Sequence, residues 1–205
     1  MIYEIGAHEG QSVRAYLNEI PEAQVWAFEP NPAVLPALNA GNDKRVTVQP
    51  CAIGSASGRA RLKVRQDSRV SSMLDVEPEL LRRSEHYRLL GEIDVDLHTI
   101  DSVVQEQGAP TPHLLRTMTR GYDLDVFRGA SQVLASGEVL LVASELYFAS
   151  AFVGQPQAHE VMGALAAFGY RLYGFDRLVE ATSGTLYFGS GLFLSPKAWK
   201  DLGLL

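Results

Sequence analysis

The sequence predicts an α/β fold in which a mostly parallel central sheet is covered by helices on both faces. Short apolar runs rich in β-forming residues alternate along the chain with segments of helical periodicity, which is the order that builds a parallel sheet. A turn with two glycines follows the first run, as at a strand-to-helix junction. The 205 residues are 46% hydrophobic and 20% charged, which predicts a single domain over residues 1–205.

Apolar runs place the strands. Residues 59–64 (RARLKV) and 93–100 (IDVDLHTI) alternate apolar and charged side chains and predict half-exposed strands, whereas the other runs predict buried ones. In order, the remaining predicted strands are residues 2–5 (IYEI), 25–28 (VWAF), 46–53 (VTVQPCAI), a strand ending after 113–115 (HLL), 138–146 (EVLLVASEL), 170–175 (YRLYGF) and 190–195 (SGLFLS).

Helical spacing of apolar side chains places the helices between these strands. Asn31 followed by Pro32 is typical of a helix start, which predicts a helix from there to Gly41, although Pro36 weakens it. The other predicted helices cover residues 13–20, 123–134 and 158–168. Residues 76–92 are highly charged and predict a helix or a lid, so we regard residues 66–92 as a candidate lid or insertion.

The turn EIGAHEGQ, from Glu4 to Gln11, is the first candidate binding site. Gly6 and Gly10 allow tight turning and a close ligand approach, and the next helix begins with free N–H groups. Glu29 follows the second strand, where a carboxylate can accept hydrogen bonds from both ribose hydroxyls of an adenosine. The pattern predicts a nucleoside-cofactor site at the carboxyl edge of the sheet; an ordinary turn without a ligand is the alternative.

Charge favours one cofactor class over another. A dinucleotide fingerprint has three glycines that let the backbone press against a pyrophosphate, but this turn has only two, and Glu4 would repel a pyrophosphate. S-adenosylmethionine carries an ammonium group and a sulfonium cation and has no phosphate. The turn therefore favours S-adenosylmethionine over NAD.

These motifs and several later ones resemble the FkbM-type methyltransferases, a family of S-adenosylmethionine-dependent enzymes. EIGAHEGQS is similar to the family's DxGAnxGq opening, and FEPNP is similar to its second-strand motif. CAIGSASGRARL, VSSML, LHTIDSVV and RGYDLDVFRGASQVL resemble later segments, and the similarity covers nearly the whole chain in the right order.

The resemblance implies a Rossmann-like class I methyltransferase fold with an antiparallel C-terminal strand. It also implies methyl transfer from S-adenosylmethionine to a hydroxyl of a sugar, a polyketide or another secondary metabolite. From the methionine end through the ribose and adenine to the covering loop, the implied cofactor residues are Glu4, Gly6, Ala7, Gly10, Glu29, Pro30, Asn31, Ala52, Ile53, Ser71 and Ser72. From the residues alone, Ser71 and Ser72 are equally well interpreted as loop serines without a ligand.

One position departs from the family pattern. Where the family commonly has Lys-Ile-Asp, this chain has Arg-Thr-Met, which puts Met118 at the aspartate position. An aspartate there could accept a proton, orient the acceptor or hold a metal, and a thioether does none of these well. The candidate substitutes are Glu145, Asp123 and His8, and we rank the two acids above the histidine. Each could equally have no catalytic role: Glu145 as a solvated strand end, Asp123 as a carboxylate at a helix start, and His8 as a hydrogen-bonding residue of the loop.

Composition bounds the partners and the location. A net charge of -6 and a pI near 5.4 argue against nucleic acid as a partner. With no apolar run long enough for a membrane span and no leader, we expect no membrane and a cytoplasmic location. The five histidines lack metal-ligand spacing, so no metal is expected, and the single Cys51 is interpreted as a packed thiol. Arg116, Arg120 and Arg128 would attract an anionic acceptor or form a solvated edge.

Three alternatives to a hydroxyl methyltransferase stay open. Met118 motivates a catalytically degenerate homologue that binds the cofactor and serves as a partner or scaffold subunit. A nicotinamide-dependent oxidoreductase and a methyltransferase acting on nitrogen or a carboxylate are the others. Family members often have additional residues before the first strand, so we expect an acceptor pocket that is more open or is closed by another subunit, as in a homo-oligomer.

Overall fold

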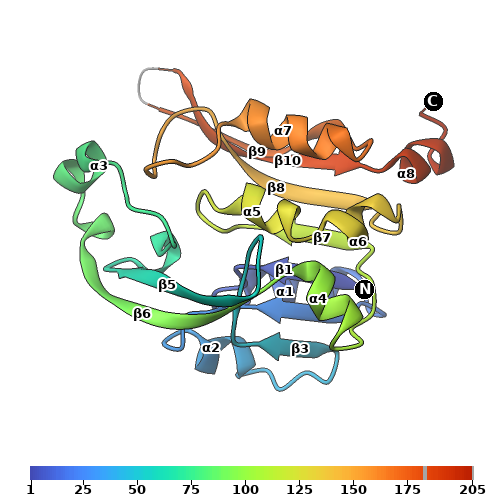
Figure 1. Cartoon of the computed structure of the whole chain (residues 1–205), viewed down its shortest axis with the longest axis horizontal. Coiled ribbons are helices and arrows are strands. Elements are labelled where there is room, and N and C mark those ends of the chain that lie inside the picture. Colours follow the sequence, from blue (N-terminus) through green and yellow to red (C-terminus); the bar gives the residue numbers. More distant parts are fainter. Residues whose placement is uncertain (182–183, 205) are drawn as a thin grey trace.

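The computed structural model describes residues 1–181 and 184–204, and its centre is a seven-stranded sheet of order β3-β2-β1-β7-β8-β10-β9 (Figure 1). The first five strands in this order pair in parallel, and β10 runs antiparallel to both β8 and β9. This topology confirms the predicted fold class, including the antiparallel strand near the carboxyl end. The strands are β1 Ile2–Ile5, β2 Val25–Phe28, β3 Val46–Gln49, β7 Leu114–Thr117, β8 Leu141–Tyr147, β9 Arg171–Glu180 and β10 Leu186–Leu194.

Helices cover both faces of this sheet because side chains alternate between its faces along each strand. Ile2 and Leu114 pack on the face of α1 (Gln11–Glu19) and α2 (Leu35–Asn39). Tyr3 and Leu115 belong to the larger core on the opposite face. That face carries α4 Ile100–Gln105, α5 Asp123–Arg128, α6 Ser131–Ala135 and α7 Ala158–Ala167, and α8 Pro196–Asp201 follows β10. No helix in the described part of the chain is long and apolar enough to cross a membrane.

A second, three-stranded sheet lies beside the central one and corrects one prediction. Residues 46–53 are not a single strand, since β3 ends at Gln49 in the central sheet and β4 (Ala52–Ile53) pairs in the small sheet. Pro50 has no N–H to donate to a ladder, and Cys51 N–H turns back to the carbonyl of Gln49 at 2.9 Å. The other two strands of the small sheet are β5 Gly58–Arg65 and β6 Leu89–His98.

The helices in the connection between β5 and β6 are short. These are η1 Ser68–Val70, α3 Pro78–Arg83 and η2 Glu85–Tyr87. Residues 89–92, predicted as part of a helix or lid, instead extend β6, where they pair antiparallel with the end of β5. Figure 1 shows β5 and β6 curving away from the central sheet toward α3.

Two predicted helices differ from the structure at their ends. The helix expected from Asn31–Pro32 begins only at Leu35, because the Asn31 side-chain oxygen accepts from Ala33 N–H at 3.1 Å and forms a local turn instead. Pro36 is accommodated because it lies in the first turn of α2.

The helix expected over residues 123–134 is divided into α5 and α6. A Cβ on Gly129 would lie 1.9 Å from the carbonyl oxygen of Gly54, so the chain passes too close to β4 for any other residue. The Asp101 carboxylate then accepts from the N–H groups of Gln132 and Val133, each at 3.0 Å, and so caps the start of α6.

Candidate functional site

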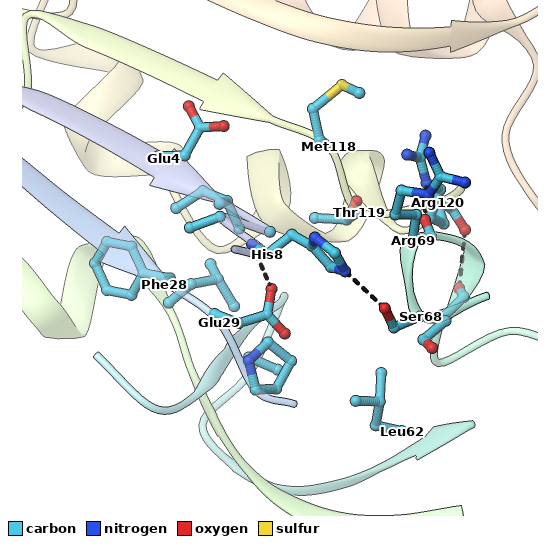
Figure 2. Close-up of a pocket in the computed structure, with 18 of the residues that line it drawn as sticks. Glu4, His8, Phe28, Glu29, Leu62, Ser68, Arg69, Met118, Thr119 and Arg120 are labelled. Atoms are coloured by element: carbon cyan, nitrogen blue, oxygen red, sulfur yellow. Dashed lines mark hydrogen bonds between the residues drawn. The ribbon is translucent and has the colours of Figure 1, made fainter. Parts of the chain in front are cut away.

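A cavity opens where β1, β2 and β7 end at the carboxyl edge of the sheet (Figure 2). The turn that follows β1 forms its floor, and the ends of β2 and β7 form two walls. The small sheet contributes Ile53 and Leu62, and the strap, which we define as residues 68–73 after β5, closes the remaining side. Carboxyl ends of parallel strands are the usual place for a ligand in such folds.

The turn after β1 is built from main-chain contacts. Gly6 has φ +81°, and a Cβ there would lie only 2.5 Å from the carbonyl oxygen of Met118. The N–H groups of Gly6 and Ala7 donate to the carbonyl of Phe28 at 2.9 and 3.0 Å. Glycine is therefore required at position 6 both for its backbone angle and for the close approach of β7.

Glu29 is the most firmly held acidic group of the cavity. One of its oxygens accepts from His8 N–H and the other from Asn31 N–H, each at 2.8 Å, and the residue is 6% exposed. Burial raises the Glu29 pKa, and the two backbone hydrogen bonds lower it. Each carboxylate oxygen has a further lone pair, so this fixed group can still accept from a pair of hydroxyls on a ligand.

Glu4 and Arg116 form a second charged element, in register on β1 and β7. The Arg116 guanidinium donates to Glu4 Oε1, whereas Glu4 Oε2 has no close hydrogen-bond partner in the part of the chain that the structure describes. Burial raises the Glu4 pKa to about 7, although the arginine and the nearby hydroxyls of Tyr16 and Ser12 oppose the shift. A ligand that carries both an ammonium and a carboxylate would meet one group of opposite charge for each at this point.

The opposite end of the cavity is small and apolar. Ala52, Ile53 and Leu62 are each at most 5% exposed and line this end together with Cys51. Burial raises the pKa of the Cys51 thiol to about 12, which fits the predicted packed thiol. Such a surface suits a flat aromatic base.

The strap is tied to the cavity by three hydrogen bonds. Arg120 Nε donates to the carbonyl of Arg69 at 2.6 Å, and the Ser72 hydroxyl donates to the carbonyl of Arg120 at 2.8 Å. Ser68 Oγ lies 2.8 Å from His8 Nε2 (Figure 2). These polar contacts hold the strap over the cavity.

No carboxylate from β7 faces the cavity. The half-buried Met118 lines it, and its thioether points away from His8 and Glu29 in Figure 2. Thr119 and Arg120 follow, and the Arg120 guanidinium forms an ion pair with Glu145.

The two acids proposed as substitutes lie beneath this strand end. Asp123 is 1% and Glu145 2% exposed, and neither lines the cavity. Burial, and then the nearby Glu145, raise the Asp123 pKa to about 6. Of the three candidate bases only His8 lines the cavity, and burial lowers its pKa.

Most of the cofactor residues implied by the motifs come together. The cavity is lined by Glu4, Gly6, Ala7, Glu29, Pro30, Ala52, Ile53, Ser71 and Ser72. Gly10 instead lines a separate cavity beneath α1 and α2, and Asn31 is buried behind Glu29, to which it contributes its N–H. The described residues contain no cluster of three potential metal ligands.

Sequence reasoning missed Leu62, Ser68 and Thr119, which also line the cavity. The alternation in RARLKV did indicate that Leu62 faces inward, but no signal placed that strand beside the turn after β1. Arg116 and Arg120 were expected to attract an anionic acceptor or to form a solvated edge, and the structure instead pairs each with a buried carboxylate.

Comparison with known proteins identifies a matching protein family. The sequence matches the Methyltransferase FkbM domain over residues 4–172. It is 23% identical over 176 residues to the 2-O-methyltransferase NoeI of Sinorhizobium fredii. The aligned region covers 82% of this chain and 72% of that protein. It is 26% identical over 124 residues to the hexuronic acid methyltransferase AglP of Haloferax volcanii, which covers 59% of this chain but only 47% of that protein.

Solved structures are similar in fold. The FkbM methyltransferase structure from Methylobacillus flagellatus KT superimposes with a TM-score of 0.58 at 14% identity. The superposition covers 94% of this chain and 42% of the Methylobacillus chain. A precorrin-6y C5,15-methyltransferase from Geobacter metallireducens GS-15 gives 0.52 at 11% identity and covers 95% of this chain and 79% of its own. At these identities the likeness concerns the fold alone.

Proposed function

The chain belongs to the FkbM methyltransferase family, and from this premise we propose that it transfers a methyl group from S-adenosylmethionine to a hydroxyl of a small molecule such as a sugar. The two relatives support the acceptor class, since one is named for methylation at a 2-oxygen and the other for a hexuronic acid. S-adenosylmethionine is the methyl donor of this family, and it supplies a methyl group made electrophilic by the attached sulfonium.

The observation that carries the proposal is the Glu29 carboxylate, buried and held by two backbone N–H groups beside the Gly6 turn. Such a fixed carboxylate fits the two hydroxyls of a ribose. Glu4 Oε2 and the Arg116 guanidinium would hold the ammonium and carboxylate of the methionine end. Ala52 and Ile53 would contact the adenine, and Ser71 and Ser72 would lie over the cofactor.

The strap lies within residues 66–92, the predicted lid or insertion. Its three hydrogen bonds join residues 68–73 to the turn after β1 and to the end of β7. We propose that residues 66–92 belong to one FkbM-like domain over residues 1–205, and that the strap is the part of this connection that moves when the cofactor enters.

Titration calorimetry of the purified protein with S-adenosylmethionine, its demethylated product and NADH tests the cofactor. We expect micromolar affinity for the first two and none for NADH. A folded protein that binds neither sulfur compound would contradict the proposal, and binding of NADH alone would favour an oxidoreductase.

Transfer is tested separately, with free hexoses, hexuronic acids and their methyl glycosides as acceptors and release of the demethylated cofactor as the readout. We expect turnover on at least one hydroxyl. Binding of the cofactor without turnover would favour the degenerate partner subunit that Met118 motivates, and products methylated on nitrogen or a carboxylate would correct the acceptor class.

A further inference from the structure

Methyl transfer to a hydroxyl is accelerated by a group that takes up the hydroxyl proton, typically by ~10²–10⁴-fold. A group with this role has to reach the acceptor, so it must line the cavity. Asp123 and Glu145 do not, because both are sealed beneath the end of β7. The base must therefore be found among the lining side chains.

Most titratable side chains that line the cavity in the described structure are unsuited to this task. As proposed above, Glu4 would be engaged by the ammonium group of the cofactor and Glu29 by its ribose hydroxyls, so neither carboxylate would be available to the acceptor. The Cys51 thiol, with its pKa raised to about 12, stays protonated at neutral pH. The lining arginines keep their protons. His8 is the one that remains.

The geometry of His8 suits a base. Its backbone, at φ +51°, is held by the N–H donated to Glu29, so the ring is carried on a fixed main chain. Figure 2 shows the imidazole extending across the cavity from the turn toward Ser68, between Glu29 on one side and Thr119 on the other. The Ser68 hydroxyl lies 2.8 Å from Nε2, so this nitrogen already has a hydroxyl group at hydrogen-bond distance.

We propose that His8 is the general base of the reaction, and that the acceptor hydroxyl takes the place at Nε2 that Ser68 Oγ holds in this structure. The inference rests on the proposed function. As the acceptor oxygen forms its new bond to the methyl carbon, its proton passes to Nε2, and the electron pair of the broken sulfur–carbon bond stays on sulfur.

Charged groups on every side of His8 act on its proton affinity. Burial lowers its pKa most, and Arg69 and Arg120 lower it further, whereas Glu9 and Asp67 raise it. Glu29 faces it too, through the backbone N–H. Since the net shift is downward, the ring is neutral at neutral pH, and the rate is expected to rise with pH to a plateau with its midpoint below the usual histidine pKa of ~6.5.

The His8→Asn variant separates the ring from the backbone it is attached to. Asparagine tolerates a positive φ well, so the turn and the N–H bond to Glu29 should persist. His159→Asn is the matched control, because His159 is exposed on α7, far in sequence from the cavity-lining residues. Thermal unfolding of both variants checks their folding.

We expect His8→Asn to bind S-adenosylmethionine within about twofold of wild type but to turn over ~10²–10⁴-fold more slowly, without the rise at low pH. Ser68→Ala should retain that rise, because the variant keeps His8 and only makes its Nε2 more accessible. If Ser68→Ala instead lost as much rate as His8→Asn, the histidine would be a tether for the strap and the inference would be overturned.

Different results would contradict the proposed function and the role of His8. A wild-type protein that binds the cofactor but methylates none of the sugar hydroxyls overturns the proposed function and this inference together. A wild-type protein that methylates a sugar while folded His8→Asn keeps its rate and pH profile overturns only the role of His8.

Discussion

Glu29 and Gly6 show how single residues determine whether the cavity can bind a ligand. Glu29 provides a carboxylate whose position is fixed by two N–H groups from separate parts of the chain, His8 and Asn31. Gly6 provides space, because β7 passes against the face where a side chain would begin. One residue is needed for its charge and the other for the absence of a side chain.

Replacing Glu29 by alanine should weaken binding of S-adenosylmethionine by ~1–3 kcal/mol, since the N–H groups of His8 and Asn31 lose their partner and the ribose loses its acceptor. Titration calorimetry measures the change. Glu22→Ala, at an exposed position before β2, is the control and should bind like wild type. Unchanged affinity in Glu29→Ala would mean that the ribose is not bound at this carboxylate.

Replacing Gly6 by alanine should destabilise the fold by at least ~1–2 kcal/mol, the cost of a left-handed backbone for a residue with a Cβ. The contact of 2.5 Å with Met118 adds to this cost. Gly41→Ala is the control, because nothing lies within 4 Å of the position that its methyl group would occupy and its backbone is unstrained. Urea unfolding compares the two variants, and equal stability would contradict the role of Gly6.

At the scale of elements, capping side chains decide where helices start. Asp101, the second residue of α4, accepts from two N–H groups at the start of α6 and from the Ser131 hydroxyl. A side chain on one helix therefore fixes the start of another, and α4 and α6 are held together through this carboxylate.

Asp101→Ala should cost ~0.5–2 kcal/mol of stability, the usual range for loss of a helix cap. Asp94→Ala is a suitable comparison, since Asp94 is exposed on β6 and its ion pair with Arg61 is 3.9 Å long. Thermal unfolding should show a clear decrease for the first variant and almost none for the second. A similar small effect in both would argue that α6 is stabilised by its apolar face alone.

The predicted elements that agree with the structure are those with an unambiguous local pattern. Buried strands such as residues 2–5 and 25–28 were predicted to the residue, because compact β-forming runs flanked by turn residues have few alternatives. The errors arise where distant contacts decide. Asp101 and the close approach of Gly54 break the helix at Gly129, and neither is visible in the local sequence.

The residues of the cavity also divide into those that a local motif predicts and those that depend on distant contacts. Residues in contiguous motifs, such as Glu4, Gly6 and Glu29, could be predicted because each lies in or directly after the end of a strand at the same edge of the sheet. Ser71 and Ser72 were implied only by the family resemblance, and the contact between His8 and Ser68 could not be predicted because it joins residues 60 positions apart. The preference for Glu145 and Asp123 as bases also depended on the ends of strands and helices, which do not indicate how deeply a side chain is buried.

At the scale of the whole molecule, buried acids couple folding to pH. Burial and the nearby Glu145 raise the Asp123 pKa to about 6, although Thr117 and Thr119 oppose the shift. A carboxyl whose pKa is higher in the folded than in the unfolded state favours folding when it is protonated. Its contribution is thus fully present below ~4 and is lost as the pH rises through about 6.

Asp123→Asn removes this dependence, because the amide stays neutral at every pH. Its stability relative to wild type should therefore be most favourable near pH ~8 and should decline as the pH falls toward ~4. Urea midpoints of both proteins across this range provide the comparison. A stability difference that does not change with pH would contradict the assignment of a raised pKa to Asp123.

The contact between the glycine turn and the end of β7 has an evolutionary consequence. Met118 meets the turn through main-chain atoms, with its N–H donating to the carbonyl of Ile5 at 2.9 Å and its own carbonyl lying against Gly6. Such contacts are the same for any amino acid with a normal backbone. A lineage of this fold can therefore exchange the side chain at position 118, and with it the local chemistry, in one mutational step that leaves the cofactor turn intact.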